Sequence, residues 1–348
     1  MSTQATLPLY LRKYDISIAL PGSTIRLASD EFEPESLRVT FEIEQRAFQV
    51  FWWAEINVWN LAENTVSDIM RAVQWQQIEV TVQAGYKSSP NGFGIIWQGP
   101  VFQTLFNREG VVDTVLTLHC VLGLGDISRN FVNQTFVAGI TQAELATKIA
   151  AQAFSKIPVA RLSDKIKSDP LPRGRTVFGS PSKYFGSIAQ DSNLQWWLDS
   201  KGLTMSGMTD DDIPTAASLT FTPPSLPVQF SVGGNPPAAG DGTIVGTPQQ
   251  TPYGVAFRAL IDSRVQVSKP FVAVKVDNSQ IRRLKQFINP GGSPQISILD
   301  QDGVYVVAGV RFTGDTRGNA WYMDIDGYTT VQAKIELMQA TAYNTNGG

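Results

Sequence analysis

The feature that most constrains this chain is one order of predicted elements that occurs twice. Residues 53–121 contain a strand, a helix, a second strand and a two-stranded hairpin, and residues 271–328 repeat that order. In both stretches the first and second strands are separated by about the same length of chain. Repetition of order and spacing indicates a duplicated unit. The sequence therefore predicts two similar α+β units, although this order of elements is common enough to recur by chance.

Alternation of apolar and polar residues orients the elements of the first unit. On the second strand, Ile78, Val80 and Val82 fall on one side, and the preceding helix over 65–73 carries an apolar stripe. Because alternation fixes which face of a strand is buried, the helix should cover the apolar side of this strand. The opposite, polar side consists of Glu79, Thr81 and Gln83.

The duplication predicts which elements superpose. Asn278 or Ser279 can cap a second helix, in which Ile281, Leu284 and Ile288 form an apolar stripe. The predicted pairs are the strands 54–61 and 271–276, the helices 65–73 and 279–288, the strands 78–83 and 296–300, and the two hairpins.

The length of the chain and its Pro/Gly-rich stretch suggest about three domains. A chain of 348 residues is too long for one ordinary core, and its many Val, Ile, Thr and aromatic residues are typical of a β-rich protein. A Thr-x-x-Glu capping box at Thr141 begins a helix in the middle of the chain. The predicted organisation is a first β domain over 1–125, a small α+β middle domain over 126–221, a Pro/Gly-rich linker or arm over 222–252, a second β domain over 253–343 and a disordered tail over 344–348.

The sequence offers no catalytic constellation. The only histidine, His119, precedes the only cysteine, Cys120, and adjacent residues of a strand point to opposite faces, so the two cannot form a nucleophile pair. The acidic run 210–212 lacks the ligand spacing of a calcium loop, and the glycines lack a phosphate-binding pattern. We therefore expect no enzyme activity, no cofactor and no metal.

Charge and hydropathy limit the classes of partner that the chain can bind. The net charge is −3 with signs interspersed, so no basic stripe for sequence-specific nucleic-acid binding is present. The one local basic concentration, over 161–175, is interpreted as an exposed loop, with an acidic partner surface as the alternative. No apolar run is long enough to span a bilayer and no secretory signal is evident, so we expect synthesis in a cytoplasm and no membrane insertion.

The second copy of the repeated order carries a resemblance to a known family. Three stretches carry it: 246–261, which leads from Gly-Thr-Pro into a strand; 274–294, with its Asn-Pro-Gly-Gly turn; and 302–322, with the turn Gly-Asp-Thr-Arg-Gly-Asn. These stretches resemble the baseplate hub proteins of tailed bacteriophages, and the first copy matches in texture and order.

The resemblance implies a fold and a structural role. The fold would be α+β and β-rich, with two similar tail-tube-type β domains, each with one packed helix, and a small middle domain. A homotrimer would present six such domains to a sixfold tail tube, as the ring that joins the tube or a tube-adaptor protein to the central spike, beside other baseplate subunits. The protein would be assembled in the host bacterial cytoplasm and reside in the virion, with only passive contact with DNA during ejection. The candidates for facing the channel are Glu79, Thr81 and Gln83.

Two readings from other classes remain open. Phe51, Trp52 and Trp53 could line the groove of a carbohydrate-binding or cell-surface-binding β module, although aromatics entering a strand are more often core residues. A hydrolase within the middle domain is the other reading, because paired carboxylates are set by distance in space and not by spacing in the sequence.

Overall fold

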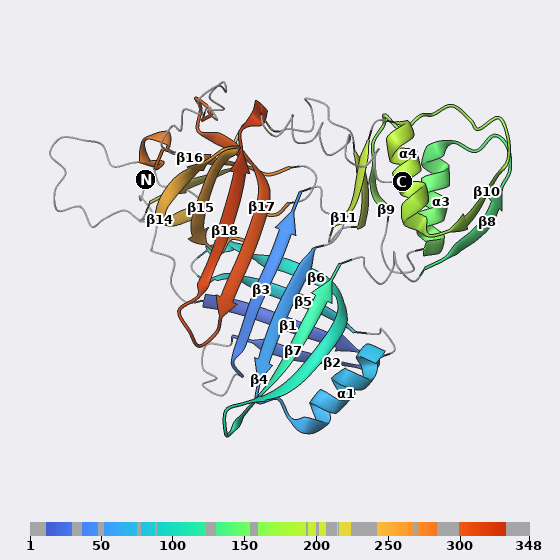
Figure 1. Ribbon diagram of the computed structural model, residues 1–348. Helices are drawn as coiled ribbons and strands as arrows, with labels where there is room; N and C mark the ends of the chain where they lie inside the picture. Colours follow the sequence, from blue (N-terminus) through green and yellow to red (C-terminus); the bar gives the residue numbers. More distant parts are fainter. Residues whose placement is uncertain are drawn as a thin grey trace, which may run out of the picture.

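Two β-rich units and a smaller middle unit make up the protein (Figure 1). The computed structural model describes residues 12–29, 37–47, 52–74, 78–87, 89–122, 130–153, 159–192, 194–199, 202–206, 214, 216–223, 242–267, 271–283 and 299–331. The two β-rich units share one 13-stranded sheet and one hydrophobic core. As predicted, the protein is β-rich with few helices.

The first unit follows the predicted alternation closely. Along β3 and β4 every second side chain is buried, and the strand order is β3-β4-β7-β6-β5-β1-β2 with antiparallel neighbours. The elements are β1 (Arg12–Leu20), β2 (Ser23–Ala28), β3 (Val39–Arg46), β4 (Trp53–Trp59), α1 (Glu63–Gln74), β5 (Glu79–Tyr86), β6 (Ser89–Glu109) and β7 (Asp113–Val121).

Helix α1 has the predicted position and apolar stripe. Val66 and Ile69 are buried in the same core as Val80 and Val82 of β5 and Ile78, the residue just before β5. Val73 packs against that core. The stripe follows from the i, i+3, i+7 spacing, which places these side chains on one side of the helix.

The second unit is a closed barrel. Strands β14, β15, β18, β17 and β16 are antiparallel neighbours in that order, and β13 closes the ring by pairing in parallel with both β16 and β14. The elements are β13 (Leu219–Thr222), β14 (Gly242–Thr251), β15 (Gly254–Leu260), β16 (Ala273–Val276), the 3-10 helix η2 (Asn278–Gln280), β17 (Val304–Asp315) and β18 (Trp321–Tyr328).

The middle unit is a small α+β structure with a separate core. The capping box is present, because Thr141 Oγ1 accepts from the Glu144 N–H at 3.2 Å and Glu144 Oε2 accepts from the Thr141 N–H at 3.1 Å. Helices α3 and α4 pack together beside a two-stranded and a three-stranded sheet. The elements are β8 (Val132–Phe136), α3 (Gln142–Ala153), β9 (Val159–Leu162), β10 (Arg175–Gly179), α4 (Pro181–Asp191), β11 (Gln195–Asp199) and β12 (Gly202–Ser206).

The predicted helix of the second unit is wrong where the structure describes it. Asp277 caps a single 3-10 turn, with its Oδ1 accepting from the Ser279 N–H at 2.9 Å, and Ile281 is already extended, with φ −79° and ψ 123°. The chain leaves the turn because the backbone of Arg282 pairs with β14. The rest of that prediction, and the strand 296–300 up to residue 298, lie outside the described residues.

Part of the predicted arm is also a barrel strand. Residues 242–251, assigned to the arm over 222–252, form β14. Ile244 is buried in the barrel core, but one proline and two glycines within residues 242–251 obscured the alternation expected of a strand. Residues 224–241 of the arm and the tail over 344–348 lie outside the described residues. In the part of the chain that the structure describes, no helix is long and apolar enough to cross a membrane.

Candidate functional site: the joint between the two units

The two β-rich units repeat one topology. The order β3-β4-β7-β6-β5 in the first unit matches β14-β15-β18-β17-β16 in the second, and every neighbouring pair is antiparallel in both. The sixth strand differs, because β1 is antiparallel to β5 whereas β13 is parallel to β16. The duplication is therefore present in five strands of each unit.

Matching β-bulges fix the residue equivalences. The β6–β7 ladder shifts between Val101 and Gln103, and the β17–β18 ladder shifts between Val307 and Gly309. Both bulges lie in the longest strand of their unit, which pairs with one neighbour before the bulge and another after it. With the bulges superposed, Phe106 corresponds to Phe312, Arg108 to Gly314 and Glu109 to Asp315.

These equivalences correct the predicted pairing of strands. The strand predicted over 54–61 corresponds to β15 and not to 271–276, and the strand predicted over 78–83 corresponds to β16 and not to 296–300. Helix α1 lies between β4 and β5, whereas the described residues between β15 and β16 contain no helix. The sequence comparison failed by one element because the capped turn at η2 imitated the start of a helix. Only the two hairpins were paired correctly.

The two units are joined edge to edge. Residues 309–315 of β17 pair antiparallel with residues 40–46 of β3, and Figure 1 shows these strands side by side. Beneath the joint, the Phe41 and Trp321 rings meet edge to face with centroids 5.3 Å apart. A Cβ atom at Gly314, directly opposite Phe41, would overlap the Phe41 ring. A glycine is therefore required there, because it lets the two strands close over a large buried aromatic residue.

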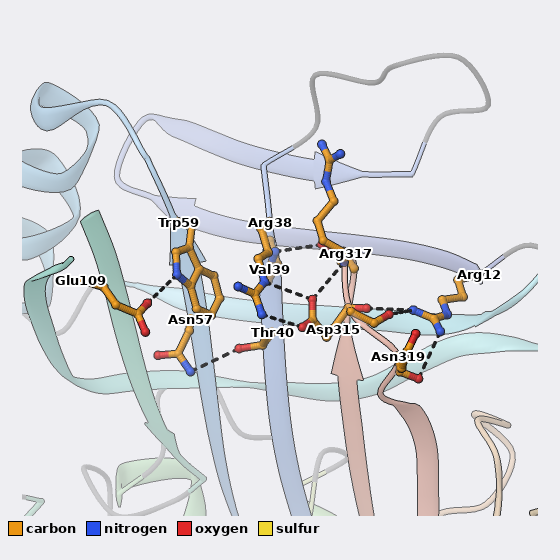
Figure 2. A network of polar contacts seen from close by, with 12 residues as sticks. Arg12, Arg38, Val39, Thr40, Asn57, Trp59, Glu109, Asp315, Arg317 and Asn319 are labelled. Carbon is orange, nitrogen blue, oxygen red and sulfur yellow. Dashed lines mark hydrogen bonds and ion pairs between the residues drawn. The ribbon is translucent and has the colours of Figure 1, made fainter. Parts of the chain in front are cut away.

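A polar network seals one end of the joint (Figure 2). The Arg38 guanidinium donates to both carboxylate oxygens of Asp315, at 2.7 and 3.3 Å, and lies over the Trp59 ring at 4.5 Å. Thr316 pairs with Val39, since its N–H donates to the Val39 carbonyl at 3.0 Å and its Oγ1 accepts from the Val39 N–H at 2.9 Å. These contacts fix the loop after β17 against the first residues of β3.

Arg12 extends the same network from β1. Its guanidinium donates to the carbonyls of Asp315 at 3.1 Å, Asn319 at 3.2 Å and Gly318, and it lies 5.7 Å from the Trp321 ring centroid. Three carbonyls of one loop thus converge on a single cation from the other unit. Charge-assisted hydrogen bonds of this kind are stronger than neutral ones.

The network changes the acidity of its members. Burial by itself would raise the pKa of Asp315, but the hydrogen bonds from Arg38 and from the backbone of Arg317 and Gly318 outweigh it and leave that pKa below its ordinary value. The hydrogen bond to Asp315 raises the pKa of Arg38. Both groups are therefore charged at neutral pH.

Two buried polar side chains tie the units together away from this network. The Gln45 amide donates to the Ile96 carbonyl at 2.9 Å and accepts from the Val267 N–H at 3.2 Å. The Tyr86 hydroxyl donates to the Trp321 carbonyl at 3.1 Å, and its burial raises the pKa of Tyr86 to about 12. Buried polar groups that are satisfied across an interface fix its register.

The solvent face of the sheet, at the joint and beside it in the second unit, is lined by charged pairs. Glu42 of β3 accepts from Arg311 of β17, and Asp324 of β18 accepts from Arg258 of β15 at 2.7 Å. Each pair spans two strands, and their alternate neighbours form the core. The shared sheet thus has one apolar face and one polar, ion-paired face.

The predicted channel residues lie elsewhere. Glu79, Thr81 and Gln83 alternate along β5 with half-buried side chains, and β5 lies between β6 and β1 and not at the joint. Glu79 accepts a hydrogen bond from the Gln98 amide at 3.0 Å. The joint itself was missed because its two strands are far apart in the sequence.

Other candidate residues are placed as follows. Cys120 is buried, which raises the pKa of its thiol, whereas the His119 imidazole is part exposed and lies 3.7 Å from a Glu55 carboxylate oxygen. The two point to opposite faces, as predicted. Trp52 is a core residue whose indole N–H donates to the Arg46 carbonyl at 2.9 Å, so it lines no groove; Phe51 lies outside the described residues. Across the described ranges, no group of three or more potential metal ligands occurs.

Solved structures similar to this chain include tail proteins and a PdpA-VgrG complex. A tail protein from Neisseria meningitidis MC58 is 11% identical, with a TM-score of 0.51 over 91% of this chain and 96% of that one. The 43 kDa tail protein of prophage MuSo2 from Shewanella oneidensis is 10% identical, with a TM-score of 0.51 over 92% and 99%. A Francisella PdpA-VgrG complex gives 7% identity and 0.51 over 92% of this chain and 58% of that one. No family model and no curated protein sequence matches.

The resemblance read from the sequence is thus confirmed at the level of the fold. The chain has the fold of phage tail proteins and of VgrG, over almost its whole length. At such low identity the similarity concerns the backbone arrangement alone.

Proposed function

We propose that this chain is a structural baseplate hub protein of a phage tail. In this proposal three copies form a ring of six similar units, which joins the tail tube or a tube-adaptor protein to the central spike beside other baseplate subunits. The ring encloses the channel through which DNA passes during ejection, and it is assembled in the bacterial cytoplasm before it resides in the virion. The protein acts as a scaffold and not as an enzyme.

The observation that carries this proposal is the joint between β17 and β3. It connects two units of equivalent topology through their sheet edges, so one chain already contains a unit-to-unit contact of the kind that a ring repeats. Two units per chain and three chains give six, which matches a sixfold tube without a symmetry mismatch. The fold shared with phage tail proteins supports a role in a tail.

The proposed conduit uses polar side chains that do not grip DNA. Carboxylates repel the phosphate backbone, whereas unpaired Lys and Arg would bind it. Glu79, Thr81 and Gln83 remain the candidates from the sequence, and the ion-paired face of the joint, with Glu42–Arg311 and Asp324–Arg258, adds a second candidate surface. On the second surface both arginines are held by these carboxylates.

The mass of the assembled protein tests the proposal. Light scattering of the full-length chain with its tail partners should give three times the 38.1 kDa of one chain for this subunit. Electron microscopy of particles that carry a labelled subunit should place the label at the end of the tail. A stable complex with one copy, or a label on the capsid, would contradict the proposal.

A further inference from the structure

Strand β6 of the first unit has one unpaired edge, whereas the equivalent strand β17 of the second unit is paired on both edges. Residues 309–315 of β17 pair with β18 on one side and with β3 on the other, whereas residues 103–109 of β6 pair with β7 alone among the residues that the structure describes. Thr114, opposite Arg108, uses its N–H and its carbonyl with Asn60. The backbone N–H of Arg108 therefore points outward, along the open edge.

This open edge is apolar. Phe102, Leu105 and Phe106 are 43%, 46% and 36% exposed, although Phe312, the counterpart of Phe106, is fully buried at the joint. A long exposed strand with apolar side chains invites pairing with another strand. Its exposure therefore marks a surface that a further strand covers.

Internal symmetry indicates which strand that is. At the joint, β17 is covered by β3, and the counterpart of β3 in the second unit is β14. Within one chain β14 does not pair with β6, because six strands lie between them, a separation of roughly 34 Å along the sheet at about 4.8 Å per strand spacing. Val245 of β14 and Tyr253 just after it are among the large apolar residues left exposed. The occupant is then a second copy of the chain.

We propose that β6 of one copy pairs antiparallel with β14 of a second copy, in the register that β17 adopts on β3. Glu109 then lies opposite Val245 of the second copy, as Asp315 lies opposite Thr40 at the joint within the chain. This inference rests on the proposed function, since it supplies the contact by which copies close a ring. Each chain contributes one open β6 and one β14, so the contact is head to tail and three copies can close on themselves.

Two neighbours lie along this edge of β14 in the single chain. Strand β13 pairs with β14 only at Gly242 and Thr243, short of Val245, and can stay in place, whereas the contact with Arg282 is exchanged. The Arg282 N–H donates to the Pro248 carbonyl at 2.8 Å, and the Gln250 N–H donates to the Arg282 carbonyl at 3.0 Å. Gln250 corresponds to Ile43, which lies opposite Phe312 at the joint. In the single chain Arg282 therefore occupies the position on β14 that Phe106 of the neighbouring copy would take. The isolated bridge between Arg282 and β14 would be replaced by a β-ladder of several residues between β6 and β14.

Paired cysteines test the register directly. Glu109 and Val245 correspond to a pair that exchanges no hydrogen bonds across the joint, in which Cα atoms lie about 4.5 Å apart, within the range of a disulfide. The full-length variant with Glu109→Cys and Val245→Cys should, on mild oxidation, give covalent species of two and three chains that disappear on reduction. Neither single variant should give them. The native Cys120 is buried, so it should not form intermolecular disulfides in this assay.

Two further variants calibrate the result. Thr313→Cys with Glu42→Cys joins an opposed pair of the joint within the chain, so it should give a disulfide without any increase in chain number. Leu105→Cys alone should stay uncrosslinked. A covalent dimer of that variant would show β6 paired with itself, which would overturn the proposal.

A backbone substitution tests the edge without cysteines. Arg108→Pro removes the outward N–H and no hydrogen bond to β7, so it should keep the melting temperature of the single chain but abolish the three-copy species. Arg108→Ala, the matched control, should assemble normally. If Arg108→Pro assembles like the wild type, or if the wild type forms three-copy complexes that the Glu109/Val245 pair never crosslinks, this inference fails while the proposed function stands. If the wild type assembles only as one copy, both fail.

Discussion

Phe106 and Phe312 occupy equivalent positions in the two units, yet only Phe312 is buried. The strands around them pair in the same order and carry a β-bulge at the same place. What differs is the next strand along: β3 pairs with residues 309–315 of β17, whereas in the described part of the chain no strand pairs with the corresponding side of residues 103–109 of β6. Whether the phenylalanine at this position is buried therefore depends on the neighbouring unit and not on the unit to which it belongs.

Substitution of the two phenylalanines should affect stability most, and very unequally. Phe312→Ala should lower the free energy of unfolding of the single chain by about 3–5 kcal/mol, because it leaves a cavity beneath the joint. Phe106→Ala should cost less than about 1.5 kcal/mol, since part of that ring already contacts water. Denaturant unfolding at low protein concentration measures both. Equal losses would mean that β6 is covered within the chain.

The elements that the sequence predicted well are those whose signal is local. Alternation along β3 and β5, the stripe of α1 and the capping box at Thr141 each involve residues within a few positions of one another. In each case burial in the structure follows the spacing. The predicted helix after Asn278 failed because its capping signal was real but served only a 3-10 turn, after which pairing with β14 drew the chain away. Tertiary contact overrode the local preference.

A smaller effect should follow from the glycine that closes the joint. Gly314→Ala should destabilise the single chain by about 1–3 kcal/mol, because its Cβ would overlap the Phe41 ring and force the strands apart. The matched control is Arg108→Ala, at the equivalent position of β6. It should change stability by less than about 0.5 kcal/mol in the single chain, where its side chain is exposed. Thermal unfolding of both variants checks the contrast, and a neutral Gly314→Ala would contradict the packing argument.

The candidate site could not be predicted from the sequence. Its two strands, 40–46 and 309–315, are brought together only by the fold, and no local pattern tells an edge that pairs within the chain from one that pairs with another copy. Glu79, Thr81 and Gln83 were chosen from alternation, which identifies a polar face but not what that face meets. The turn residues after Gly314 belong to one of the three stretches that carried the resemblance to hub proteins. The structure shows why such a turn is useful, since its carbonyls bind Arg12 and its Thr316 pairs with β3.

The ion pair between Arg38 and Asp315 should make a smaller, pH-dependent contribution to stability. The pKa of Asp315 in the folded chain lies below its ordinary value, about 3.9 for aspartate, so the unfolded chain binds more protons between the two values. The stability contributed by Arg38 and Asp315 is therefore complete above about pH 4 and is lost as the pH falls through the lower pKa of the folded state. Asp315→Asn should cost about 1 kcal/mol at pH 7, because the Arg38 side of the pair is exposed to solvent, and less at acid pH.

The equivalent position of the first unit supplies the control. Glu109 accepts a hydrogen bond from the Trp59 indole at 2.9 Å, and a glutamine oxygen can accept the same bond. Glu109→Gln should therefore cost less than about 0.5 kcal/mol at pH 7. Unfolding curves from pH 7 to pH 3 should show the wild type and Asp315→Asn converging as the acid protonates Asp315. If the difference in unfolding free energy between the two proteins stayed constant over this range, the charge of Asp315 would contribute nothing to stability. The ion pair with Arg38 would then not be what distinguishes the paired edge of β17 from the unpaired edge of β6.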